Sequence, residues 1–133
     1  MPLSKDRNTA MKDGELIPVP VAATAVIFAG ALVVANATGY AAPGSVATTL
    51  TYLGRAEEMV DNSGGADGDK SVLVRRKKAF FWKNSGTDPV TQASLGKPCY
   101  IVDDETVAAT NGTNTRSAAG TVVGIESGGI WVH

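Results

Sequence analysis

Residues 18–37 read PVPVAATAVIFAGALVVANA, and the structure taken by this uncharged stretch decides the fold. An Ala-Gly pair at residues 29–30 divides it into two apolar runs, residues 25–28 and 31–34. The Asn-Ala-Thr-Gly sequence that follows at residues 36–39 is typical of a turn. The stretch therefore predicts two short buried strands, which explain its hydrophobicity without a membrane.

A cleaved secretory signal is the alternative interpretation of the same stretch. Lys5, Arg7 and Lys12 precede it, and Ala-Asn-Ala at residues 35–37 is similar to a signal-peptidase site. However, acidic residues lie among these basic ones, and prolines open the apolar run. Because both features are atypical of a signal, we expect the segment to be retained.

The composition favours a single all-β domain. A chain of 133 residues is about one domain long. It is rich in Ala, Val, Thr and Gly and poor in helix formers at helical spacing, which favours strands and tight turns. Short apolar or alternating segments recur, separated by Gly, Asn and Asp: residues 48–57, 70–82, 99–102, 106–108, 120–125 and 130–132. The sequence predicts a small β-barrel or β-sandwich over residues 16–133.

The first residues of the chain predict a flexible N-terminal arm. Residues 1–15 are polar and show neither helical nor strand periodicity. A segment without an apolar face cannot bury enough surface to offset the entropy of ordering, so it orders only on a partner.

The charge pattern favours local recognition. The 12 basic and 13 acidic residues nearly cancel, which excludes a global field toward nucleic acid or an anionic membrane. Four consecutive basic residues break this balance: Arg75, Arg76, Lys77 and Lys78. In one continuous strand or hairpin, Phe80 and Trp82 would share a face with Arg76 and Lys78. Three interpretations of this cluster remain: a solvated strand with cationic stems over apolar surface, contact with an acidic protein surface, and nucleic acid binding.

No motif in the sequence predicts catalysis, a cofactor or a metal. A single cysteine, Cys99, rules out an internal disulfide and Cys-rich zinc sites, and its apolar surroundings predict a buried thiol. The one histidine, His133, lies at the mobile end of the chain, whereas a catalytic triad needs a histidine oriented by a buried carboxylate. Residues 64–71 (GGADGDKS) are similar to a phosphate-binding loop, but Asp69 replaces its second glycine. The acidic loop at residues 61–69 fits no calcium-loop spacing, and the adjacent carboxylates of residues 103–105 point in different directions.

The succession of turns and strands resembles the capsid decoration, or cement, proteins of tailed bacteriophages. The residues that carry this resemblance are 27–33 (IFAGALV), 39–43 (GYAAP), 54–68 (GRAEEMVDNSGGADG), 72–76 (VLVRR), 97–108 (KPCYIVDDETVA), 120–125 (GTVVGI) and 130–132 (IWV). The resemblance implies a compact β domain, usually a homotrimer, that binds the major capsid protein on the outer face of an icosahedral shell. It carries over no catalytic residue. Residues 77–82 are more basic and more aromatic than the resemblance implies.

We therefore expect a structural virion protein on the outer capsid surface, made in the host cytoplasm and without enzymatic activity or a cofactor. No small-molecule substrate, nucleic acid or membrane is expected as a partner. The expected interface with the capsid comprises Lys5, Arg7, Lys12, Arg75, Arg76, Lys77, Lys78 and Trp82. The alternatives are a glycan-binding head-fibre or adhesin module, in which Trp82 or Trp131 stacks on a sugar, and a secreted β protein cleaved after Ala37.

Overall fold

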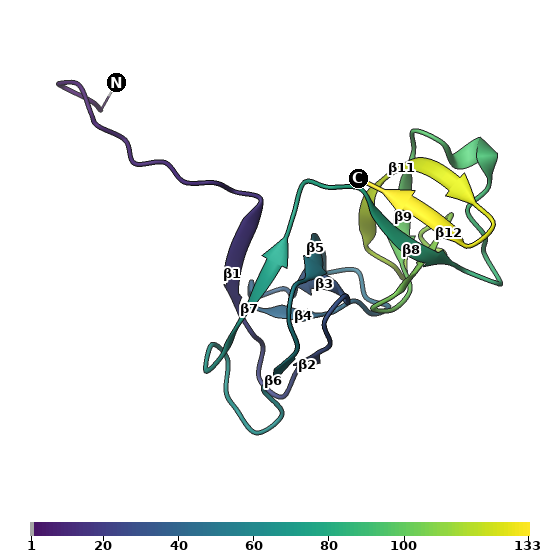
Figure 1. Ribbon diagram of the computed structural model, residues 1–133, viewed down its shortest axis with the longest axis horizontal. Helices are drawn as coiled ribbons and strands as arrows, with labels where there is room; N and C mark the ends of the chain where they lie inside the picture. Colours follow the sequence, from purple (N-terminus) through teal and green to yellow (C-terminus); the bar gives the residue numbers. More distant parts are fainter. Residues whose placement is uncertain (1) are drawn as a thin grey trace.

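The chain folds almost entirely into strands, as Figure 1 shows for the computed structural model. The structure describes residues 2–133, so Met1, which belongs to the predicted arm, lies outside the described residues. The strands are β1 (Leu16–Pro20), β2 (Val26–Ile27), β3 (Leu32–Ala35), β4 (Ala41–Pro43), β5 (Thr51–Ala56), β6 (Val60–Asp61), β7 (Ser71–Arg75), β8 (Phe80–Asn84), β9 (Pro98–Ile101), β10 (Thr106–Ala108), β11 (Ala118–Glu126) and β12 (Gly129–Val132). A 3-10 turn, η1 (Gln92–Ser94), precedes β9. The all-β prediction is confirmed.

The first half of the chain forms a five-stranded sheet in the order β1-β7-β5-β3-β4, beside the short pair β2-β6. A bridge between Val21 and Ala41 joins the ends of the two outer strands, β1 and β4. The buried side chains between them form the N-terminal core: Val19, Val21, Ile27, Ala31, Val33, Ala41, Ala56, Val60, Val72 and Val74. The sheet therefore curls around its own apolar residues.

β1 is a strand that the hydrophobic pattern missed. It pairs antiparallel with β7, with Val19 opposite Val72. The Arg76 backbone N–H donates to the Glu15 carbonyl, and the Val21 N–H donates to the Lys70 carbonyl. The backbone N–H and C=O groups of the odd-numbered residues of β1 therefore face β7. The backbone nitrogens of Pro18 and Pro20 consequently face the outer edge of the sheet. There the missing N–H removes no hydrogen bond of the sheet, and it discourages a further strand from pairing with β1.

The second half of the chain forms a closed barrel of five strands in the order β10-β8-β12-β11-β9. Closure leaves no free edge strand, which is a common solution for small antiparallel sheets. Its interior is the barrel core: Leu32, Val34, Phe80, Trp82, Val90, Cys99, Ile101, Val107, Val122, Ile130 and Val132. The barrel predicted as one of two all-β architectures is thus present.

β3 supplies side chains to both cores. Val33 lies in the N-terminal core, whereas Leu32 and Val34 lie in the barrel core. Successive strand residues point to opposite faces, so a strand between two cores is apolar at every position. Further contacts join the halves: the Leu32 N–H donates to the Asp104 carbonyl at 2.7 Å, and the Ser117 hydroxyl donates to the Ala47 carbonyl at 2.6 Å. Residues 16–133 therefore hold two hydrophobic clusters that share one strand.

Candidate partner-binding surface

The four basic residues lie where the chain passes from the N-terminal sheet to the barrel. β7 ends at Arg75 and β8 begins at Phe80, and these two strands belong to different sheets. We call residues 75–79 the basic linker. Lys77 takes a left-handed conformation with φ of 60°, which breaks the strand alternation. The predicted continuous strand or hairpin is therefore wrong: Lys77 and Lys78 are exposed, while Phe80 and Trp82 turn into the barrel core.

The basic linker holds the root of the N-terminal arm. The Arg76 backbone N–H donates to the Glu15 carbonyl at 2.7 Å, and the Arg76 guanidinium donates to the Gly14 carbonyl at 3.2 Å. Lys78 Nζ lies 3.2 Å from a carboxylate oxygen of Glu15. The exposed ion pair contributes little by itself, but the paired backbone fixes where the arm leaves the body.

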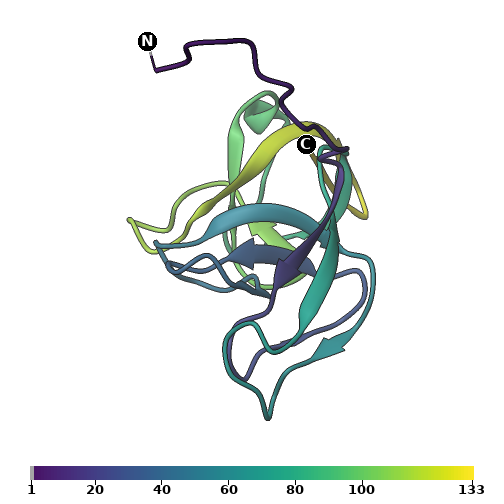
Figure 2. The same cartoon turned by 90° about the vertical axis from the view of Figure 1, so that its left-hand side faces the viewer.

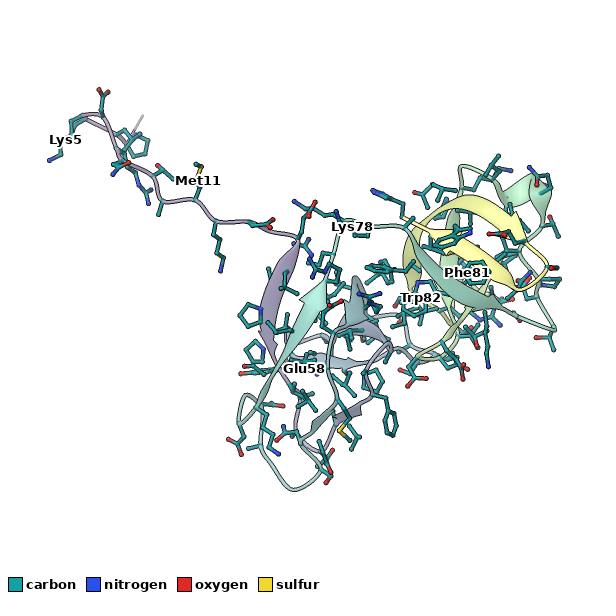
Figure 3. All side chains as sticks on the ribbon, in the orientation of Figure 1. Lys5, Met11, Glu58, Lys78, Phe81 and Trp82 are labelled. Carbon is teal, nitrogen blue, oxygen red and sulfur yellow. The ribbon has the colours of Figure 1, made fainter. Side chains whose placement is uncertain are left out.

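Beyond this root the arm lies free of the body. Residues 2–13 are all exposed, and the Met11 side chain retains 97% of its accessible surface. Figures 1 and 3 show the arm leaving beside β1 and pointing away from the barrel, with Lys5 and Met11 far from Trp82. Within the described residues, the ion pairs do not include Lys5, Arg7 or Lys12. The structure thus brings the arm root to the basic linker and leaves three basic side chains beyond it without an ion-pair partner among residues 2–133.

Arg75 is less available than its neighbours. Its guanidinium lies 3.6 Å from a carboxylate oxygen of Glu57, which also pairs with Arg55. The hydrogen bond from Arg55 is the main cause that lowers the pKa of Glu57, and Arg75 adds to it. The Arg55 guanidinium in turn lies over the Phe80 ring, 5.3 Å from its centroid. Arg75 therefore belongs to a surface network, whereas Lys77 and Lys78 face solvent.

Trp82, which was predicted to lie in the interface, is buried. Its side chain is only 5% exposed within the barrel core, and its indole Nε1–H donates to the Tyr52 hydroxyl at 3.1 Å. Burial raises the pKa of Tyr52 to about 12. Trp82 therefore joins the barrel to β5 and is not available to cover a partner or stack on a sugar.

Comparison with known proteins gives no indication of function, so the function is inferred from the chemistry of these residues. No protein family, curated protein or solved structure matches the chain. Within residues 2–133, no helix is long and apolar enough to cross a membrane.

An exposed aromatic pair lies on the outer face of the barrel. Phe81 and Trp131 stand opposite each other on β8 and β12, with ring centroids 4.8 Å apart. Glu126 accepts the indole N–H of Trp131. A hollow of about 280 Å³ beside the pair is also lined by Arg55 and Gly30. Trp131 is among the residues predicted from the sequence to stack on a sugar, whereas Phe81 is not; its signal is its position between the two buried aromatic residues of β8.

The cysteine, the acidic loop and the histidine considered as possible chemical sites have structural roles. Cys99 is buried, as predicted, and burial raises the pKa of its thiol to about 12, so little reactive thiolate forms at neutral pH. In the acidic loop, the buried Asn62 amide donates to the Ala22 carbonyl at 2.9 Å. His133 is paired through its backbone with Thr121. Residues 2–133 contain no group of three His, Cys, Asp or Glu side chains placed to hold a metal.

Proposed function

We propose that this chain is a structural virion protein that binds the outer surface of a bacteriophage capsid and stabilises or decorates the shell. The observation that carries the proposal is the exposed arm rooted on the basic linker. Both parts carry exposed cations: Lys5, Arg7 and Lys12 on the arm, and Lys77 and Lys78 on the linker that holds its root. An acidic face of the major capsid protein is the partner that fits them.

The entropy cost of ordering the arm favours a protein partner over a small molecule. Ordering a free backbone costs about 1–2 kcal/mol per residue, so an exposed arm is ordered only where an extended surface offers many contacts. Coupled ordering of this kind lets a small domain span two neighbouring subunits. A homotrimer, which the proposal includes, would multiply weak contacts into avidity.

The body is suited to a passive mechanical role. The closed barrel and the Pro-edged β1 leave few strand edges for unwanted pairing. The two cores share β3, so strain applied to one half is transmitted to the other. We infer no catalytic step for this chain, and its place is the outer capsid surface.

Binding to purified shells tests the proposal. Shells of the source virus that lack this chain are mixed with the wild type, with a variant lacking residues 2–12, and with the double variant Lys77→Glu, Lys78→Glu. Both variants should bind at least about tenfold more weakly, because the deletion removes the arm cations and the double substitution sets like charges against an acidic shell surface. Lys97→Glu is the matched control, since Lys97 is exposed on the barrel and distant in sequence from arm and linker. Unchanged binding by both variants, or absence of the chain from purified particles, would overturn the proposal.

Glycan binding is a second candidate because Trp131 and Phe81 form an exposed aromatic pair. Aromatic faces next to polar groups are suited to sugars, and Arg55 and Glu126 supply such groups. If this candidate holds, Trp131→Ala abolishes binding to host surface glycans and leaves shell binding intact.

The secreted alternative would cost the fold several strands. Cleavage after Ala37 would remove β1, β2 and β3, and with β3 the side chains shared by both cores. The intact mass of the protein from its native source decides between the two forms.

A further inference from the structure

A second exposed feature lies at the junction of the two halves. Phe28, Ala29, Gly30 and Ala31 form a tight turn, and together with Asp104 and Glu105 they line a surface hollow of about 260 Å³. We call these six residues the Phe28 corner. The Phe28 side chain is 60% exposed, unlike most aromatic side chains of this protein. The hydrogen bond from the Leu32 N–H to the Asp104 carbonyl holds the acidic loop against the turn.

The rim of this hollow carries excess negative charge. Asp103, Asp104 and Glu105 are consecutive, and Lys83 pairs with Glu105 at 2.8 Å. Partial burial is the main cause that raises the pKa of Asp104, and the like charges of its two neighbours add to it. The corner therefore combines an exposed ring with carboxylates that gain from a basic ligand.

The arm has the complementary pattern. In an extended chain, alternate side chains lie on one face, which places Leu3, Lys5, Arg7 and Met11 together. This face has apolar ends and a basic centre, whereas the Phe28 corner has an exposed aromatic ring and an acidic rim. Residues 2–13 span about 40 Å when extended, which is comparable with the diameter of a domain of this size. The arm is thus long enough to reach an adjacent molecule.

The direction of the arm favours a second molecule over its own body. Its root is fixed at the basic linker by Arg76 and Glu15, and from there it points away from the barrel in Figure 1 and ends above the body in Figure 2. The Phe28 corner, by contrast, includes residues of the loop between β9 and β10 of the barrel. To reach its own corner the arm would have to reverse its course.

We propose that the arm of one copy docks on the Phe28 corner of a second copy, with Lys5 and Arg7 against Asp104 and Glu105 and Leu3 against Phe28. This inference rests on the proposed function only for the setting, since a shell surface would hold copies side by side. There, arm exchange would link neighbouring copies into a net; Lys5 and Arg7 would then contact a second copy, and Lys12, Lys77 and Lys78 would supply the cations that face the shell.

A charge swap in solution tests the inference without a shell. The arm variant is Lys5→Glu, Arg7→Glu, and the corner variant is Asp104→Lys, Glu105→Lys. Sedimentation velocity of the full chain at low salt should show concentration-dependent association of the wild type. Each variant alone should associate at least about tenfold more weakly, because like charges would then meet at every contact. An equimolar mixture should recover association, because the reversed arm of one variant matches the reversed corner of the other.

The recovery in the mixture is the decisive result, since only exchange between molecules produces it. Circular dichroism and thermal melting of each variant confirm that it is folded, and Lys97→Glu controls for a change in net charge. Association should also weaken as sodium chloride rises, because exposed charges are screened. A wild type that stays monomeric, variants that associate like the wild type, or a mixture that fails to recover would overturn the inference. If association recovers in the mixture but the wild type does not bind shells, the proposed function alone is refuted. If the wild type binds shells but association does not recover in the mixture, this inference alone is refuted.

Discussion

Replacing Tyr52 with Phe removes one oxygen atom at the junction between the N-terminal sheet and the barrel. The Tyr52 hydroxyl on β5 accepts the indole N–H of Trp82 on β8 at 3.1 Å. Figure 3 labels Trp82 at the side of the barrel that faces the N-terminal sheet. The substitution keeps the ring and nearly all its volume, so it tests the hydrogen bond and hardly disturbs the packing.

The expected cost follows from the burial of the donor. Trp82 is 5% exposed, so its N–H would be left in the barrel core with little access to water. An unsatisfied buried donor costs about 1–3 kcal/mol, and we expect about 1–2 kcal/mol because the hydrogen bond is only partly buried. In a domain of this size, about 1 kcal/mol corresponds to a fall in melting temperature of roughly 4 °C.

Urea unfolding followed by tryptophan fluorescence measures this cost. Trp82→Phe and the double variant complete a double-mutant cycle, whose coupling free energy should exceed about 0.5 kcal/mol. Tyr100→Phe is the matched control, because within the described residues the Tyr100 hydroxyl makes no side-chain hydrogen bond. A cost for Tyr52→Phe below about 0.3 kcal/mol would refute the reasoning, since the bond would then add nothing beyond what the control loses.

The same pair predicts an alkaline transition. Burial raises the pKa of Tyr52 from 10.0 to about 12, so the folded state retains a proton that the unfolded chain gives up. The stability from this group is complete below pH 10 and is lost as the pH rises from 10 toward 12. Melting temperatures of Tyr52→Phe should lack this part of the alkaline decline, and an identical decline in both proteins would contradict the assignment.

Three further substitutions give separable results. Gly54→Ala would place a Cβ 2.0 Å from the Arg75 carbonyl oxygen at a φ of 150°, so we expect a loss of several kcal/mol, about 3 or more, seen as a lower urea midpoint or insoluble protein. Lys77→Gly relieves a left-handed conformation and should raise the melting temperature by about 2–4 °C, whereas no change or a fall would contradict this. The hydrogen bond from Thr110 is the main cause that lowers the pKa of Asp88, so stability from Asp88 is present above the ordinary aspartate pKa of about 4 and is lost as pH falls below it. Asp88→Asn should therefore flatten the acid side of the stability profile and speed amide exchange in residues 110–117, and normal exchange there would count against the role of Asp88.

Local chemistry was sufficient for some of the strands and turns. The Asn36 side-chain oxygen accepts the backbone N–H groups of Thr38 and Tyr40, which is the kind of turn that its sequence predicted. The uncharged run at residues 31–34 predicted a buried strand and became β3. These outcomes depend on neighbours a few residues apart, so the sequence contains the information for them.

The sequence by itself determined that the chain is all-β, that its cysteine is buried, and that its first residues show neither helical nor strand periodicity. Only the tertiary structure decided that β3 serves two cores, that Lys77 breaks the strand so that Trp82 turns inward, and that Arg76 holds the root of the arm. An apolar residue indicates burial but not the core that buries it, and a basic residue indicates charge but not its partner. Both depend on contacts between residues far apart in the chain, which exist only once the two halves have packed together.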